Sequence, residues 1–82
     1  MRQERHFTKK ESGFLIDVLL LTDSVGWYHV KASLIDNNPG NSILLQYSNL
    51  CYSAEAYDKA VKSYNQHVEY YQEKVAEVEG TH

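Results

Sequence analysis

The chain has 82 residues, of which 43% are hydrophobic and 23% are charged, and its formal net charge is −3. A chain of this length forms one domain and buries only roughly 60% of its unfolded surface, so stabilisation by a partner subunit is expected. Its single cysteine, Cys51, excludes an internal disulfide, and its short apolar runs argue against a membrane-spanning helix.

The first eleven residues have neither a helical nor a strand pattern of apolar side chains. Within the first ten positions stand four basic side chains and one acidic one: Arg2, Arg5, Lys9, Lys10 and Glu4. This segment therefore carries +3, and the remaining residues carry −6. Since no apolar stretch follows the basic residues, we expect no signal peptide and a cytoplasmic protein. We expect residues 1–11 to be a flexible basic N-terminal arm and residues 12–82 to form a single βββα domain.

Two segments with strand patterns follow the arm. Residues 14–21 are apolar at nearly every position except Asp17, which predicts a strand with both faces covered. Turn formers in residues 22–26 end this strand. Residues 27–35 alternate between two faces, which predicts a half-buried strand. Its inner face holds Tyr28, Val30, Ala32 and Leu34.

A turn and a third strand come next. Residues 38–41, with the sequence Asn-Pro-Gly-Asn, fit a type II turn, because proline favours its second position and glycine its third. Residues 42–50 alternate again, and we assign their odd-numbered face to the core. The core side chains of this strand are therefore expected to be Ile43, Leu45 and Tyr47.

The last third of the chain contains a regular helical stripe. Seven apolar or aromatic residues recur at alternating spacings of four and three: Tyr57, Val61, Tyr64, Val68, Tyr71, Val75 and Val78. This spacing places them on one face of a helix, which we expect over residues 54–78, with Ser53 as N-cap and Gly80 as the stop. Because the stripe contains tyrosine and valine but no leucine, packing on the chain's own sheet is favoured over a coiled coil.

These elements predict an α+β fold, namely a three-stranded antiparallel meander followed by one long C-terminal helix packed on one sheet face. One helix leaves the other sheet face uncovered, and an exposed apolar patch marks a contact surface. We also expect the helix tip to extend beyond the sheet and to reach a second subunit. The predicted partner-binding residues are Leu15, Leu19, Leu21, Trp27, His29, Lys31, Ile35, Leu44, Tyr70 and Tyr71.

No residue pattern predicts catalysis, a cofactor or a metal. The four histidines, His6, His29, His67 and His82, lack the spacing of metal ligands. Cys51 has no local signature of a nucleophile, and its apolar neighbours predict a buried or half-buried thiol.

We therefore expect a non-enzymatic protein–protein interaction module, a small regulator or inhibitor that acts as a homodimer. It would bind a protein partner through the apolar sheet face and the helix tip, since most soluble oligomers are twofold homodimers. Nucleic-acid binding by the basic arm is the alternative. It is disfavoured because the acidic body of the chain repels phosphate.

Overall fold

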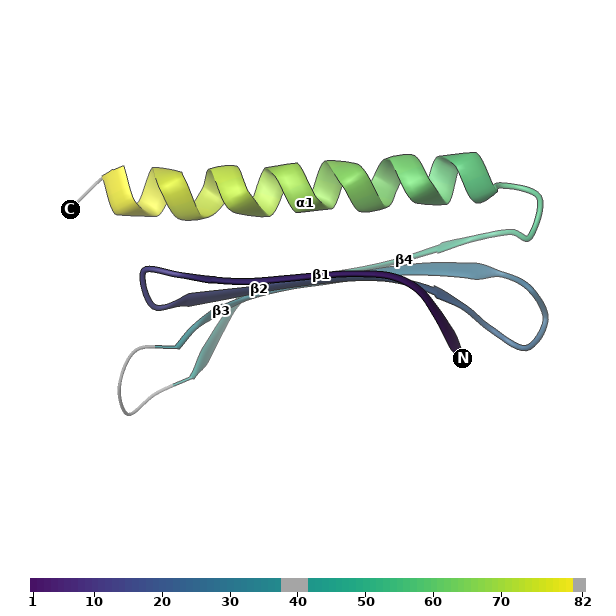
Figure 1. The fold of residues 1–82 in the computed structure, drawn as a ribbon, viewed down its shortest axis with the longest axis horizontal. Helices are drawn as coiled ribbons and strands as arrows, with labels where there is room; N and C mark the ends of the chain where they lie inside the picture. The colour runs from purple at the N-terminus through teal and green to yellow at the C-terminus, as the bar shows by residue number, and fades with distance from the viewer. Residues whose placement is uncertain (38–41, 81–82) are drawn as a thin grey trace.

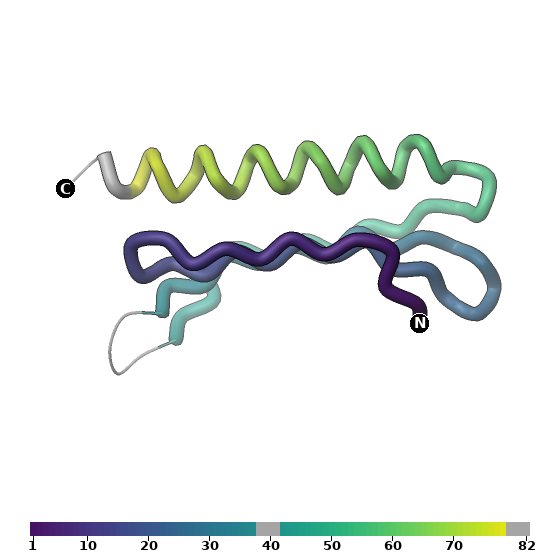
Figure 2. The backbone as a smooth tube through the Cα atoms, in the orientation of Figure 1, coloured from purple at the N-terminus to yellow at the C-terminus, as the bar shows by residue number. Residues whose placement is uncertain are grey.

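The computed structural model describes residues 1–37 and 42–80, the side chains of the last two excepted. Its elements are β1 (Arg2–Glu11), β2 (Phe14–Thr22), β3 (Tyr28–Asp36), β4 (Ile43–Tyr52) and α1 (Tyr57–Gly80). The strands form one antiparallel sheet in the order β1-β2-β3-β4, and α1 lies along one face of it (Figures 1 and 2). The α+β class and the C-terminal helix are confirmed, but the sheet has four strands instead of three.

The additional strand is the segment expected to be a flexible arm. Residues 2–11 pair with β2 along its length, from Glu11 opposite Phe14 to Arg2 opposite Thr22. The expectation was wrong because an edge strand requires little apolar surface, and β1 contributes only Phe7 to the margin of the core. The boundary between arm and domain near residue 12 is in fact the turn of a hairpin.

That hairpin turns through two residues, Ser12 and Gly13, which have φ values of 51° and 83°. Two successive positive φ values define the type I′ turn, whose twist matches that of the flanking strands. Glycine adopts this conformation freely, whereas a serine side chain is strained there. Ser12 is the one non-glycine residue in the described part of the chain with positive φ.

Replacing Ser12 by asparagine is expected to stabilise the protein. Asparagine tolerates positive φ and is the preferred first residue of a type I′ turn, so the free energy of unfolding should rise by about 0.5–1 kcal/mol. Urea denaturation measures this change. The matched control is Ser24→Asn, in a loop where the residue does not have positive φ, and it should leave stability unchanged. Equal effects of both substitutions would contradict the assigned strain.

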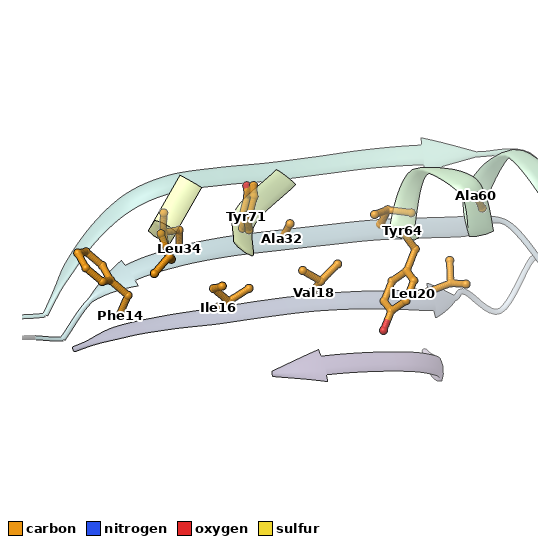
Figure 3. Packing of buried hydrophobic residues seen from close by; sticks show 11 residues of the cluster. Phe14, Ile16, Val18, Leu20, Ala32, Leu34, Ala60, Tyr64 and Tyr71 are labelled. Atoms are coloured by element: carbon orange, nitrogen blue, oxygen red, sulfur yellow. The ribbon is translucent and has the colours of Figure 1, made fainter. Parts of the chain in front are cut away.

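The core lies between the sheet and α1 (Figure 3). Its buried apolar residues are Phe14, Ile16, Val18, Leu20, Val30, Ala32, Leu34, Ala60, Tyr64, Tyr71 and Val75. The inner face expected for β3 is confirmed, the even-numbered side chains of β2 lie in the core beside it, and most of the helical stripe is buried or half-buried. Sequence periodicity did not indicate Ala60, because its small side chain falls between two positions of the stripe where the helix approaches the sheet.

The assignment of β4 was wrong by one residue. Val30 pairs with Leu50 and Leu34 with Gln46, so the even-numbered residues in this part of β4 share the face of the core. A register shift follows, because Ile35 pairs with Leu44 and leaves Leu45 as an extra, bulged residue. The residues expected in the core are exposed: Ile43 at 52%, Leu45 at 47% and Tyr47 at 58%.

The helix begins three residues later than expected, and its contact with the sheet continues along its second half. Ser53 is not its N-cap: the Ser53 carbonyl accepts a hydrogen bond from the Ala56 N–H in a separate turn, at 2.9 Å, and α1 starts at residue 57. Near its other end, Tyr71 and Val75 are each 1% exposed, so this part of α1 is docked on its own sheet instead of extending beyond it. The turn predicted over residues 38–41 lies outside the described residues.

Candidate functional site

The sheet face opposite α1 gathers most of the predicted partner-binding residues. Across β2 and β3, Leu15 pairs with Ile35, Leu19 with Lys31, and Leu21 with His29. All six side chains are half-buried, because each is shielded by its neighbours along and across the strands. Two more predicted residues are exposed: Leu44 of β4, at 57%, and Trp27 in the loop before β3, at 45%.

Polar side chains interrupt this outer face. The side chains of Asp17 of β2 and His6 of β1 are hydrogen-bonded at the surface, so the head of this carboxylate has a partner. Together with Lys31 of β3, these side chains divide the leucines into smaller groups. The outer face is therefore less continuous as an apolar surface than the sequence pattern predicts.

A second carboxylate, Asp23, organises the loop between β2 and β3. Its Oδ1 accepts hydrogen bonds from the N–H groups of Val25 and Trp27, at 3.0 and 2.9 Å. Its Oδ2 lies 2.8 Å from Nε2 of His29. The bond with His29, followed by the two backbone bonds, lowers the pKa of Asp23 below its ordinary value. The sequence offered only a turn signal here, since the partners depend on the curvature of the loop.

This arrangement predicts a pH dependence. The pKa of Asp23 is lower in the folded than in the unfolded chain, so the carboxylate stabilises the fold above pH ~4 and loses this effect as pH falls through the folded-state value. Asp23→Asn should therefore melt below the wild type at pH 7, and the difference should shrink at pH 3. Thermal melts at both pH values test this, with Glu69→Gln on the exposed side of α1 as control. A difference that persists at pH 3 would contradict it.

The exposed apolar surface is concentrated on β4. Of the ten exposed large apolar side chains in the described residues, five belong to this strand: Ile43, Leu44, Leu45, Tyr47 and Leu50. β4 is an edge of the sheet, so one side of its backbone has no neighbouring strand among the described residues. None of its ten residues is charged.

The opposite edge, β1, is built differently. It carries six charged residues along ten positions, and its register shifts at Glu4. Charges of this density keep an edge strand from pairing with other chains. Two of its cations are already paired, Arg2 with Glu4 at 2.7 Å and Lys9 with Glu11 at 3.3 Å, which reduces the positive charge available to a phosphate backbone.

A groove of about 230 Å³ separates β4 from the side of α1. No aspartate, glutamate, lysine or arginine lines it; its lining residues are Gln46, Ser48, Gln66, His67, Tyr70 and Tyr71. Nδ1 of His67 donates to the Ser63 carbonyl at 2.7 Å, and its Nε2 forms a hydrogen bond with the Ser48 hydroxyl at 3.2 Å. This bond connects the helix to the edge strand and fixes one wall of the groove.

The two helix residues predicted to bind a partner, Tyr70 and Tyr71, differ in their exposure. Tyr70 is 45% exposed at the groove, where its hydroxyl accepts a hydrogen bond from the Gln46 amide at 3.4 Å. Tyr71 is 1% exposed and belongs to the core, so its side chain, unlike that of Tyr70, offers no surface to a partner in this structure. Burial raises the pKa of the Tyr71 phenol, and its hydroxyl has no hydrogen-bond partner among the described residues.

The remaining chemical groups form no further cluster. The Cys51 thiol, expected to be at least half-buried, is exposed, because it lies on the outer side of β4 opposite His29. Among the described residues, no group of three or more histidine, cysteine, aspartate or glutamate side chains is placed to hold a metal ion. No helix in the described part of the chain is long and apolar enough to cross a membrane.

The apolar edge and the adjoining groove are thus the distinctive surface of the molecule. Comparison of the chain with protein-family models, with curated proteins and with solved structures finds no match.

Proposed function

We propose that this chain is a protein-binding module that binds its partner through β4 by accepting an additional strand. The observation that carries this proposal is the contrast between the two edges of one sheet. Each edge strand has one register shift, at Glu4 in β1 and at Leu45 in β4, but β1 carries six charged residues, whereas β4 is uncharged and exposes apolar side chains. A long, uncharged, apolar edge is a template for strand addition, in which backbone hydrogen bonds supply affinity and alternate side chains supply specificity.

The surroundings of β4 suit an incoming strand. On the outer side of the sheet, Leu44 and Tyr47 offer apolar contact beside the half-buried Ile35. On the helix side, the groove beside Gln46 and Tyr70 has room for side chains of the added strand. In this role the chain acts without catalysis, as a regulator or inhibitor that covers or completes the sheet of its partner.

Selection from a library of displayed ten-residue peptides tests this function. Peptides that bind should be extended, with alternating apolar residues, and their binding should shift the backbone amide signals of β4. Proline is then placed at Ser48 and, separately, at Asn49. Adjacent residues of an antiparallel strand point their N–H groups to opposite sides, so one proline removes only an outward N–H and leaves the pairing with β3 intact.

The folded proline variant should lose the selected peptides. The control is an exposed residue of the charged edge, with Thr8→Lys expected to retain them. Failure to enrich any peptide, or peptides that perturb the outer faces of β2 and β3 while leaving β4 unchanged, would refute strand addition at this edge.

A further inference from the structure

We propose that β4 pairs antiparallel with β4 of a second copy of this chain, so that two four-stranded sheets join into one continuous sheet. This rests on the strand-addition function proposed above and names the partner. An antiparallel edge is complementary to itself, because a twofold axis through its centre places each outward N–H opposite an outward carbonyl. Among edges of this molecule, β4 is the one suited to such pairing.

Charge decides between the two edges. Two copies of a chain with net charge −3 repel one another unless they meet through a neutral surface. β4 has no charged side chain, and the helix side chains along the groove are Gln66, His67 and Tyr70. Pairing of β1 with itself would instead bring its exposed cations, including Arg5 and Lys10, close to those of the second copy.

In this dimer the two copies contact each other through their β4 strands and not through their helices. The twofold axis is perpendicular to the sheet, so both helices lie on the same face. Since α1 packs mainly over β2 and β3, strand spacings of about 4.8 Å place the two helix axes about 20 Å apart. This exceeds the 8–10 Å of packed helices. The helices therefore flank a cleft over the paired β4 strands, with Tyr70 of each copy on its walls.

The size of the contact sets the expected affinity. A ten-residue strand is about 34 Å long, and a sheet is about 10 Å thick, so the pairing buries roughly 340 Å² per copy, compared with about 800 Å² for a standard interface. We therefore expect a reversible dimer with a dissociation constant in the micromolar range. Sedimentation should give a mass that rises with concentration from one towards two chains between 1 and 500 µM.

Charge substitution near the centre of β4 tests the twofold pairing. Asn49 is exposed and lies opposite Lys31 of β3, so Asn49→Glu gains a neighbour of opposite charge within its own chain. In the dimer, however, the two glutamates approach each other. The matched control is Thr8→Lys on the other edge, which likewise lies opposite a complementary charge, Asp17.

We expect Asn49→Glu to weaken dimerisation at least tenfold and Thr8→Lys to leave it unchanged. An equimolar mixture of Asn49→Glu and Asn49→Lys should associate more tightly than either variant alone. A wild type that is monomeric at 500 µM, or an Asn49→Glu variant that dimerises like the wild type, would overturn the proposal. If a monomeric wild type still binds selected peptides at β4, the strand-addition function stands and only the identity of the partner is refuted.

A cysteine scan gives an independent test and locates the axis. Cys51 is replaced by serine, and each residue from 46 to 50 is replaced in turn by cysteine. The residue nearest the axis faces its own copy and should form a disulfide-linked dimer under mild oxidation. The control is Thr8→Cys in the same background. Cross-linking at Thr8→Cys that is as fast as at every position of β4 would also overturn the proposal.

Discussion

Replacing Val75 by aspartate is expected to unfold the domain. Val75 is 1% exposed, packed between α1 and the sheet. An unpaired carboxylate there loses its hydration without gaining a partner, and the cost is several kcal/mol. Since a domain of this size has about 5–10 kcal/mol of stability, most of the folded population should be lost. Circular dichroism at 25 °C and a thermal melt measure the effect.

The neighbouring residue provides the control for Val75. Ala76 is exposed on the same turn of α1, so Ala76→Asp introduces the same charge at nearly the same distance from the helix end. It should cost under about 1 kcal/mol, the amount by which helix propensity falls from alanine to aspartate. If Val75→Asp melted near the wild type, this half of α1 would not be docked as described.

Deletion of residues 1–11 is expected to cost several kcal/mol of stability. The sequence pattern treats this segment as a dispensable arm, whereas the structure makes it the antiparallel neighbour of β2. Its removal breaks the hydrogen bonds between β1 and β2, removes Phe7 from the core margin and exposes the apolar strand β2 as a new edge. We expect a truncated chain that is largely unfolded or aggregated, as measured by circular dichroism and sedimentation.

A variant that keeps β1 separates the role of the strand from the role of its outward side chains. Thr8 and Lys10 are exposed, and replacing both by alanine should change the free energy of unfolding by roughly 0.5–1 kcal/mol. A truncated chain that melted at the wild-type temperature would restore the interpretation of residues 1–11 as an arm.

The strands and their core faces could be predicted from the sequence to the extent that each strand is buried. In β2 and β3, burial of one face and the turn formers around them fixed the alternation, so the core residues from Ile16 to Leu34 followed from the sequence. β1 and β4 are edges, where exposure relaxes the demand for apolar alternation. The charged β1 therefore resembled a flexible tail in sequence. In β4, the bulge at Leu45 shifts the alternation of the two faces, and the spacing of apolar residues in the sequence does not indicate this bulge.

The candidate site was predicted in part for the same reason. Apolar residues beyond the capacity of one helix predicted a contact surface, and of the predicted partner-binding residues Leu44 and Tyr70 are exposed. The sequence pattern placed the exposed apolar surface on the sheet face, whereas in the structure half of the exposed large apolar side chains of the described residues lie on the edge strand β4, and edge strands are identified by pairing and not by composition. Tyr71 belongs to the helical stripe that packs on the sheet. The periodicity of this stripe therefore already indicated that Tyr71 is buried.

The order of strands along the sheet, which is their order along the chain, has a consequence for how the protein folds. Every strand pairs with its neighbour in sequence, and the β1–β2 connection is only the two residues Ser12 and Gly13. Such hairpins form in microseconds, and folding rates rise as contacts become more local in sequence. We expect the docking of α1 on the completed β2–β3 surface to be the slowest step, because these contacts join segments that lie far apart in the chain.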